Sequence, residues 1–345
     1  MSTISLCMIV KDEESNIRRC LDSIKSIIDE IIIVDTGSSD KTKDICSEFT
    51  DKLYDYQWNG NFADARNFSI QKASSDWILW MDADEELYIK SISRLKENLD
   101  LEEIAFFSIK MLHILVTAED YDKQPYISYN YRLFRNRLDF KFEGAIHEKL
   151  LLKGQMEEAP ICNCIQILHY GYSENSVLKK ANRNLELLLE KKNRSDEPWL
   201  DYHIAAELYR LQDYETAFQF VNQSIVGFLS QGILPPSLAY KLKYDLLIHS
   251  NNMEHAYQGI EKAIELYPDY VELHFYRGVI LYFLKQYETA VKAFTYCLIL
   301  GENNPHYLIR SGSGSSHAYY YLGECYTKMG MHAIAQAAYQ QAALS

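Results

Sequence analysis

Short apolar runs alternate with amphipathic stretches over the first quarter of the chain. Each run is too short for a buried helix and rich enough in bulky residues for an interior strand. Between the runs, apolar residues recur at helical spacing, as at Ile17, Leu21, Ile24 and Ile28. Alternating strands and helices predict an α/β domain with a mixed, mostly parallel sheet. The expected strands are Ile4–Val10, Glu30–Val34, Lys52–Tyr56 and Trp77–Met81, and the expected helices lie at 17–28, 40–49 and 62–73.

The pattern weakens after Glu86 and turns helical from Lys179. Two more strands are expected, Ile104–His113 and Tyr126–Arg135, the second rich in Tyr, Phe and Arg. We therefore expect three parts along the chain. These are an α/β domain at 1–178, a helical linker at 179–198 and an all-α domain at 199–345.

The last of these parts repeats itself. DYETA at 213–217 recurs as QYETA at 286–290, and NMEHA at 252–256 takes the same place between them. Ala256 and Ala290 are 34 residues apart, which is the period of a tetratricopeptide repeat. The region resembles a tetratricopeptide array, in which each helix pair stacks on its neighbours to form a solenoid with a concave surface.

A last copy of the repeat has its alanine at Ala335, after a serine- and glycine-rich insertion at 311–316. Small residues stand where paired helices must approach closely, at Ala205, Gly278 and Gly323. Most of the many tyrosines in this part are expected to pack in the repeat core or line its groove. A few of them could form a platform for an extended peptide, and a second protomer could cover the last helix, giving a homodimer.

Composition and charge exclude several classes of function. The chain has 345 residues, 48% hydrophobic and 24% charged, which is a globular composition with room for more than one core. Its formal net charge of −13 argues against nucleic-acid binding, because phosphate contacts need clustered Lys and Arg. No stretch approaches the roughly 20 apolar residues of a membrane span.

The N-terminal residues and the cysteines favour a reduced, cytoplasmic protein. Ile4–Val10 lacks a basic leader and a cleavage site, so it is interpreted as a strand and not as a signal peptide. The seven cysteines are scattered, and only Cys162 and Cys164 lie close together, at a spacing that suits neither a zinc site nor a redox pair. Ordinary buried thiols are expected.

Carboxylates follow two of the predicted strands directly. Asp35 ends the second strand, and Asp82 and Asp84 follow the fourth. Carboxyl ends of parallel strands open on one edge of a sheet, where ligands bind in open α/β folds. Asp35 can accept an N–H from a pyrimidine base or a ribose hydroxyl, and the D-x-D pair can hold Mg²⁺ or Mn²⁺ with a diphosphate. D-x-D alone is also common as a solvated acidic turn.

Four motifs in order resemble glycosyltransferase family 2. They are CMIVKDE at 7–13, IVDTGSSDKT at 33–42, ARN at 65–67 and MDAD at 81–84. The resemblance covers about the first half of the chain and implies the nucleotide-sugar-binding A-type fold. It also implies inverting transfer from a nucleotide diphosphate sugar, usually a UDP-sugar, with Mn²⁺ or Mg²⁺ as cofactor. Neither a dinucleotide-binding nor a P-loop motif is present.

The resemblance assigns residues to the donor site. It implies that Asp35 contacts the base, Arg66 the nucleotide, Asp82 the ribose or the metal and Asp84 the metal. Arg66 could instead be a surface arginine on a helix. The remaining positions assigned to nucleotide-sugar binding within these motifs are Val10, Asp12 and Ala83.

Two later segments match motifs of related tetratricopeptide-linked members, G-x-x-H-E and H-x-G-Y. They are FEGAIHE at 142–148 and IQILHYGY at 165–172. Direct displacement at an anomeric carbon needs a base for the acceptor's proton, and Glu148 or His147 could serve. His169 could supply an imidazole to a metal held by two carboxylates and a diphosphate. Alternatively, the histidine is only hydrogen-bonded and Glu148 only orients a neighbour.

The sequence therefore predicts a metal-dependent glycosyltransferase fused to a tetratricopeptide domain. Because a solenoid groove suits extended chains, the favoured acceptor is a peptide or protein, modified at a Cys or Ser side chain. The layout is similar to the sublancin-type S-glycosyltransferases that glucosylate bacteriocin precursor peptides. We expect it to differ from the best-known of them in lacking an extra N-terminal region before the first strand. The alternatives are a polysaccharide or lipid-linked acceptor, and a scaffold without catalytic activity.

Overall fold

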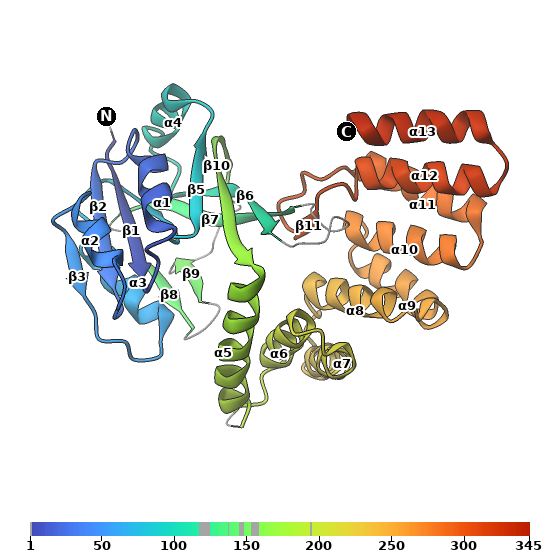
Figure 1. Ribbon diagram of the computed structural model, residues 1–345, viewed down its shortest axis with the longest axis horizontal. Coiled ribbons are helices and arrows are strands. Elements are labelled where there is room, and N and C mark those ends of the chain that lie inside the picture. Colours follow the sequence, from blue (N-terminus) through green and yellow to red (C-terminus); the bar gives the residue numbers. More distant parts are fainter. Residues whose placement is uncertain (1, 117–124, 137, 145–147, 153–158, 194) are drawn as a thin grey trace. The chain divides into compact units, whose positions relative to one another are not determined.

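The structure is a computed structural model, and it describes residues 2–116, 125–136, 138–144, 148–152, 159–193 and 195–345. The chain divides into two compact units (Figure 1). The first comprises Met1–Ile114 and Ser128–Gly171, and the second comprises Leu115–Ile127 and Tyr172–Ser345. No described helix is both long and apolar enough to cross a membrane.

The first unit is built on one large sheet, and its first four strands in space are parallel. Val10 is paired with Asp35, and Cys7 with Trp80, so the carboxyl ends of three neighbouring strands lie on one edge. The predicted mixed, mostly parallel sheet is confirmed in these strands. The order in space is β3 (Leu53–Asp55), β2 (Glu30–Asp35), β1 (Ile4–Val10), β4 (Trp77–Trp80), β7 (Tyr126–Arg135), β6 (Phe106–Val116), β10 (Ile161–Ser173) and β5 (Glu85–Ile89).

Both faces of this sheet are covered. Leu6 and Met8 of β1 pack in a core with α1 (Ile17–Ile24), α2 (Thr42–Ser47) and α4 (Ile92–Leu99). Successive side chains of a strand point to opposite faces, and Cys7 accordingly joins a second core. That second core lies under α3 (Phe62–Gln71) and the hairpin of β8 (Phe140–Glu143) and β9 (Lys149–Leu152). Two covered faces explain why every residue of the first strand except Ser5 is apolar.

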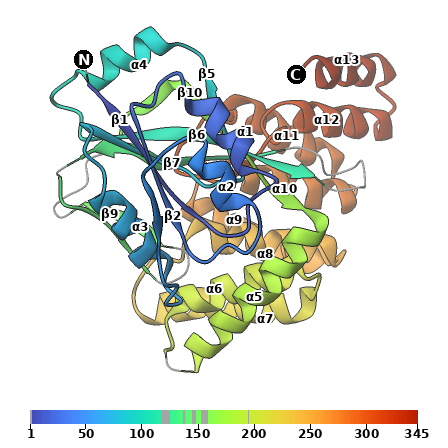
Figure 2. The same ribbon diagram turned by 60° about the vertical axis from the view of Figure 1, so that its left-hand side comes forward.

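The second unit contains α5 (Glu174–Lys192) and then four helix pairs within residues 195–345 (Figures 1 and 2). The alanines that mark the repeat phase, Ala217, Ala256, Ala290 and Ala335, are all buried. The predicted tetratricopeptide architecture is confirmed. The pairs are α6 (Pro198–Arg210) with α7 (Tyr214–Ser230), α8 (Ser237–His249) with α9 (Met253–Leu266), α10 (Val271–Phe283) with α11 (Tyr287–Leu300), and α12 (Ser316–Lys328) with α13 (His332–Leu344).

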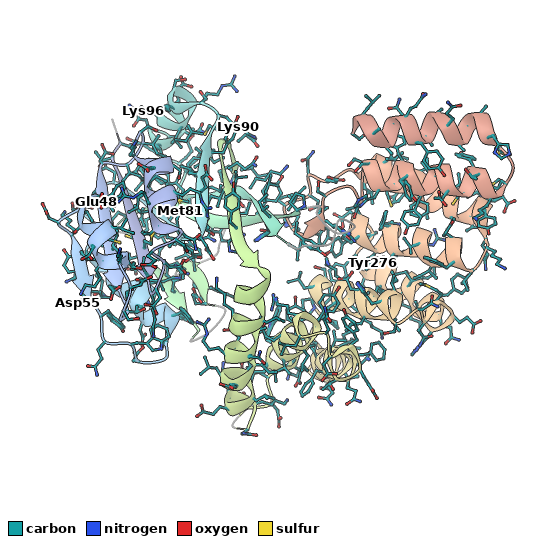
Figure 3. The ribbon with its side chains drawn as sticks, viewed as in Figure 1. Glu48, Asp55, Met81, Lys90, Lys96 and Tyr276 are labelled. Carbon is teal, nitrogen blue, oxygen red and sulfur yellow. The ribbon has the colours of Figure 1, made fainter. Side chains whose placement is uncertain are left out.

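The insertion predicted at 311–316 forms a turn over 311–315, and Ser316 begins α12. One oxygen of Glu302 accepts hydrogen bonds from the amides of Gly312 (2.8 Å) and Gly314 (2.9 Å). Before this turn, β11 (Ile309–Arg310) pairs with the first residues of β7, Tyr126 and Ile127, which belong to the second unit. Figure 3 shows Tyr276 on α10 among the repeat helices and Met81 among the strands of the first unit.

Candidate functional site

Asp35 has one oxygen in use and one unused. Its Oδ1 accepts the amides of Gly37 and Ser38, both at 2.9 Å, so the carboxylate holds the tight turn after β2. Its Oδ2 is buried and has no hydrogen-bond partner among the described residues. An ionised oxygen buried without a partner is costly, and a ligand N–H or O–H would satisfy it. The geometry therefore fits an acceptor for a base or ribose donor.

Asp12 and Val10 shape the loop beside Asp35. Asp12 has a left-handed backbone, with φ of 53°, and its Oδ1 accepts the amide of Ser39 at 2.7 Å. This bond lowers the pKa of the Asp12 carboxyl. The buried Val10 accepts the amide of Thr36 at 2.9 Å through its carbonyl. Both residues, expected to bind the nucleotide sugar, hold the loop between β2 and α2 against β1 in the described contacts.

Arg66 joins two of the predicted residues. From α3, its Nη2 donates to Asp82 Oδ1 at 2.8 Å and its Nε to Glu148 Oε1 at 2.5 Å. Its guanidinium carbon lies 4.4 Å from the ring centre of Trp80, and the side chain is 9% exposed. The surface-arginine alternative is thereby excluded. Glu148 is brought into the site, whereas His147 lies outside the described residues.

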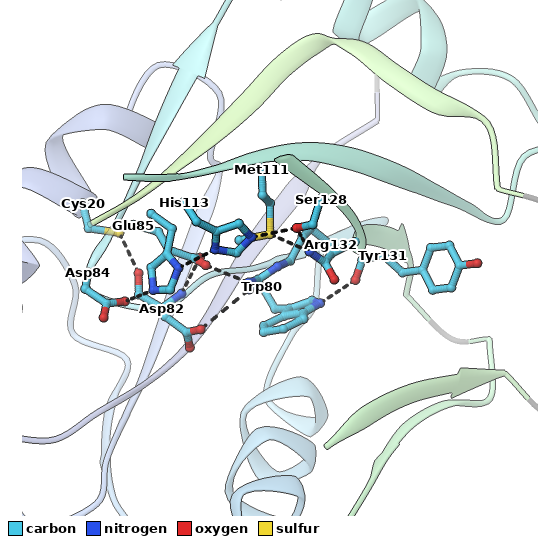
Figure 4. Close-up of polar contacts among 12 residues, drawn as sticks. Cys20, Trp80, Asp82, Asp84, Glu85, Met111, His113, Ser128, Tyr131 and Arg132 are labelled. Atoms are coloured by element: carbon cyan, nitrogen blue, oxygen red, sulfur yellow. Dashed lines mark hydrogen bonds and ion pairs between the residues drawn. The ribbon is translucent and has the colours of Figure 1, made fainter. Parts of the chain in front are cut away.

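A second buried arginine supports the D-x-D turn, and motif reasoning missed it (Figure 4). Arg132 on β7 stacks on Trp80 from 3.5 Å and donates to Glu85 Oε1 at 2.7 Å. The other Glu85 oxygen accepts the amide of Asp82 at 2.9 Å. Burial raises the pKa of Glu85 to about 7, against the opposing charge of Arg132. The arginine-rich composition of β7 was the available signal.

Asp82 lies between the two arginines. Its Oδ2 is 3.9 Å from Arg132 Nη1, and its Oδ1 is bonded to Arg66. Burial alone would raise the pKa of Asp82, but the charges of Arg66 and Arg132 keep it below its ordinary value. Ala83, the middle residue of the turn, is buried in the core and offers only its backbone to a ligand.

Asp84 points to a pair of histidines. His169 Nε2 is 3.5 Å from Asp84 Oδ1, and His169 Nδ1 is 3.0 Å from His113 Nδ1. Burial disfavours the charged form of His169, yet Asp84 raises its pKa above the usual value. Burial, followed by the charge of His169, lowers the pKa of His113 to about 3. Figure 4 shows Asp84 of the D-x-D turn and His113 near it.

The donor atoms around Asp84 fit a hard divalent cation in part. A carboxylate and an imidazole converge there, and diphosphate oxygens can complete such a shell. Asp82, the other expected ligand, is directed to Arg66 and Arg132 instead. Among the described residues, no three His, Cys, Asp or Glu side chains form a ready-made metal cluster. Among the expected metal ligands, Asp84 and His169 lie 3.5 Å apart, whereas Asp82 is bonded to Arg66.

Comparison with known proteins found two matching family models and several relatives. The family model for glycosyl transferase family 2 matches residues 5–149, and a tetratricopeptide repeat model matches residues 260–292. A TPR repeat-containing protein of Synechococcus elongatus is 33% identical over 284 residues, which are 77% of this chain and 65% of the relative. The SPbeta prophage-derived glycosyltransferase SunS of Bacillus subtilis is 31% identical over 290 residues, covering 81% of this chain and 67% of SunS.

A shorter match, to an uncharacterized glycosyltransferase of Rickettsia felis, is 39% identical over 87 residues, or 25% of this chain and 30% of the relative. The chain spans about two thirds of the length of the first two relatives. The sheet, the polar groups at its edge and these matches define a glycosyltransferase. The chain belongs to glycosyltransferase family 2, and tetratricopeptide repeats follow its transferase domain.

Proposed function

We propose that this glycosyltransferase inverts the anomeric centre as it moves a hexose from a UDP-sugar to a Cys or Ser side chain of a peptide or protein. The observation that carries the donor half is the unpartnered, buried Oδ2 of Asp35. It lies on the same strand edge as the D-x-D turn, beside which Asp84 and His169 converge. A nucleotide diphosphate sugar has a base N–H for the first position and a diphosphate for the second.

In this proposal Asp35 accepts the N–H of the uracil ring, and the amide bonds of its other oxygen orient it. Arg66 places positive charge beside the nucleotide, held in position by Trp80 and Glu148. Mg²⁺ or Mn²⁺, held by Asp84 and His169, would stabilise the charge on the departing diphosphate. Asp82 would contact the ribose, or bind the cation after leaving Arg66.

Glu148 is the proposed base. It would accept the proton of the acceptor thiol or hydroxyl as that atom forms its bond to the anomeric carbon and the bond to the diphosphate oxygen breaks. A single displacement of this kind inverts the anomeric configuration. The ion pair with Arg66 fixes the direction of the Glu148 carboxylate, which general-base catalysis requires. His147 remains the second candidate for the base.

A peptide acceptor is supported by the repeats, because stacked helix pairs in tetratricopeptide arrays offer a concave surface suited to extended chains. The similarity to SunS favours the same class of acceptor. A polysaccharide or lipid-linked acceptor is the alternative for the same chemistry. A scaffold without activity would not need Asp35, Arg66, Asp82 and Asp84 together.

The test is UDP release from a panel of UDP-sugars with Mn²⁺, with and without a cysteine-containing peptide. We expect peptide-stimulated release in the wild type and its loss in Asp84→Ala. Asp22→Ala, which removes an exposed carboxylate from α1, should behave as the wild type. Equal UDP release with and without peptide would indicate a glycan or lipid acceptor instead. The absence of release with every sugar would overturn the enzyme assignment in favour of the scaffold.

A further inference from the structure

We propose that His113 is a positioning residue for the cation site, because it accepts the Nδ1–H of His169 and so directs the Nε2 lone pair of His169 to the place beside Asp84. This inference rests on the proposed function, in which His169 and Asp84 hold a divalent cation. His113 belongs to none of the motifs that identify the family.

Only one proton can lie between the Nδ1 atoms of His113 and His169. Their Nδ1 atoms are 3.0 Å apart, so one nitrogen donates and the other accepts. A neutral imidazole carries a single N–H. If His169 donates from Nδ1, its Nε2 keeps a lone pair for a cation. If His113 donates instead, the proton of neutral His169 is on Nε2, facing Asp84 at 3.5 Å, and that nitrogen cannot bind a metal.

The Nε2 atom of His113 has a partner that allows His113 to accept the Nδ1–H of His169. We call this chain of contacts, from Ser128 through His113 to His169, the relay. His113 Nε2 is 2.8 Å from Ser128 Oγ, and Asn130 Nδ2 donates to the same oxygen at 2.9 Å. A hydroxyl oxygen has two lone pairs, so it can accept from both. His113 can then carry its proton on Nε2 and leave Nδ1 as the acceptor for His169. Figure 4 shows His113 between Ser128 and the D-x-D turn.

The strands keep these groups in register. His113 lies on β6, which stands between β7, carrying Ser128, and β10, carrying His169. His169 is paired with Glu85, and the amide of Tyr170 donates to the carbonyl of Asp84 at 2.9 Å. Groups held on neighbouring strands keep their geometry better than groups on loops. Partners behind a ligating histidine commonly fix its tautomer in this way.

The experiment measures Mn²⁺ affinity in the presence of UDP, by electron paramagnetic resonance, for the wild type and two His113 variants. His113→Phe removes the acceptor, and we expect about 10- to 100-fold weaker Mn²⁺ binding. His113→Asn places a carbonyl oxygen near the lost Nδ1, and the affinity should return to within about threefold of the wild type. His255→Phe, at an exposed position on α9, is the matched control and should not change the affinity.

Nuclear magnetic resonance of ¹⁵N-labelled histidines gives a readout independent of activity. In the wild type with UDP and Mg²⁺, His169 should carry its proton on Nδ1, and this signal should be lost in His113→Phe. Equal Mn²⁺ affinity in His113→Phe and the wild type, or a proton on Nε2 of His169 in the Mg²⁺ complex, would overturn the relay.

The same experiment distinguishes failure of the proposed cation site from failure of the relay. If Asp84→Ala binds Mn²⁺ as well as the wild type, or the wild type does not bind it, the cation site is wrong and the relay falls with it. If Asp84→Ala abolishes binding and His113→Phe leaves it unchanged, only the relay is wrong. A His113→Phe chain that fails to fold is detected by circular dichroism, and His113→Asn with the tautomer measurement then decides.

Discussion

The two oxygens of Asp35 have different surroundings, and the difference leads to a test of the nucleotide site. Asp35→Asn can keep one oxygen on the amides of Gly37 and Ser38, so the turn should survive. The amide group would then stand where the unpartnered Oδ2 is and would face the base N–H with a second donor. We expect UDP affinity to fall by roughly 10- to 100-fold, the cost of one buried hydrogen bond lost to repulsion.

Isothermal titration with UDP measures that change. Asp22→Asn is the control, because Asp22 is an exposed carboxylate on α1 that pairs with Lys25. Unchanged UDP binding in Asp35→Asn, with the fold intact, would remove Asp35 from the base-binding role.

Glu148 gives a second prediction at the scale of the residue. Glu148→Gln keeps an oxygen that can accept the Nε–H of Arg66, so the 2.5 Å contact and the position of Arg66 should persist. The amide cannot take a proton from the acceptor. We expect transfer to fall by about 100-fold or more while UDP affinity stays within about twofold of the wild type.

Single-turnover transfer to peptide, beside UDP titration, separates the two quantities. If transfer is unaffected, Glu148 serves only to orient Arg66, and His147 becomes the candidate base. A fall in both quantities would indicate that the ion pair with Arg66 supports nucleotide binding.

Some residues of the candidate site could be predicted from sequence motifs and others could not, and the reason is physical. Asp35, Asp82 and Asp84 follow apolar runs directly, so their place at a strand end is visible in the sequence. Arg132 lies on β7 and His113 on β6, and both reach the site through the pairing of strands from distant segments. Strand order and register of such segments depend on tertiary packing, so the sequence did not predict these two. Glu85 directly follows the D-x-D pair, but its contact with Arg132 depends on the same packing.

At the scale of the element, the predicted close approach of paired repeat helices leads to a stability test. A Cβ added to Gly278 on α10 would lie 2.6 Å from a ring carbon of Phe294 on α11. Alanine gains about 1 kcal/mol over glycine in a helix, but overpacking costs about 1–3 kcal/mol. We therefore expect Gly278→Ala to lower the free energy of unfolding, by about 1 kcal/mol.

Chemical denaturation followed by circular dichroism measures the effect. The helical Gly259 is the matched control, because its added Cβ would meet only the Tyr244 hydroxyl, at 3.1 Å. Adding Phe294→Leu to Gly278→Ala should recover part of the loss. A Gly278→Ala variant as stable as the Gly259→Ala variant would show that the helices can move apart without cost.

The turns inside the repeats have a backbone conformation that residue preferences do not fully predict. The residue two positions before the second helix of each pair has a left-handed backbone, with φ of 63° at Gln212, 52° at Asn251, 61° at Lys285 and 75° at Gly330. Only glycine, and to a lesser degree asparagine, signals that conformation in a sequence. The repeat period placed these turns, whereas residue preference alone would have missed Gln212 and Lys285.

At the scale of the whole molecule, the sequence predicted two kinds of architecture, their order and a boundary between them near residue 178. The segment Leu115–Ile127, which starts in the last two residues of β6 and ends in the first two of β7, is grouped with the helical unit. Within that unit, Lys241 Nζ lies 4.6 Å from the ring centre of Tyr126 and 2.7 Å from Asp245. No periodicity in the sequence predicts the contact between Lys241 and Tyr126, because that contact depends on how the repeats fold.

The same unit contains a buried carboxyl that makes the stability of the molecule depend on pH. Glu272 is fully buried on α10, with Oε1 accepting from Ser313 at 3.0 Å and Oε2 without a partner among the described residues. Burial raises the pKa of Glu272 from 4.5 to about 7, despite the positive charge of Lys241. The folded state therefore binds this proton more tightly than the unfolded chain does.

The sign of the effect follows from that difference. The stabilisation is fully present below pH 4.5 and is lost as pH rises through about 7, by on the order of 3 kcal/mol. Glu272→Gln keeps an acceptor for Ser313 and stays neutral, so this loss should disappear from the variant. Urea denaturation of the helical unit at pH 5 and pH 8 measures it, and Glu215→Gln, at an exposed position, removes the same formal charge as a control. An equal change between the two pH values in the wild type and Glu272→Gln would mean that Glu272 is ionised without cost, and that water or a rearrangement reaches its second oxygen.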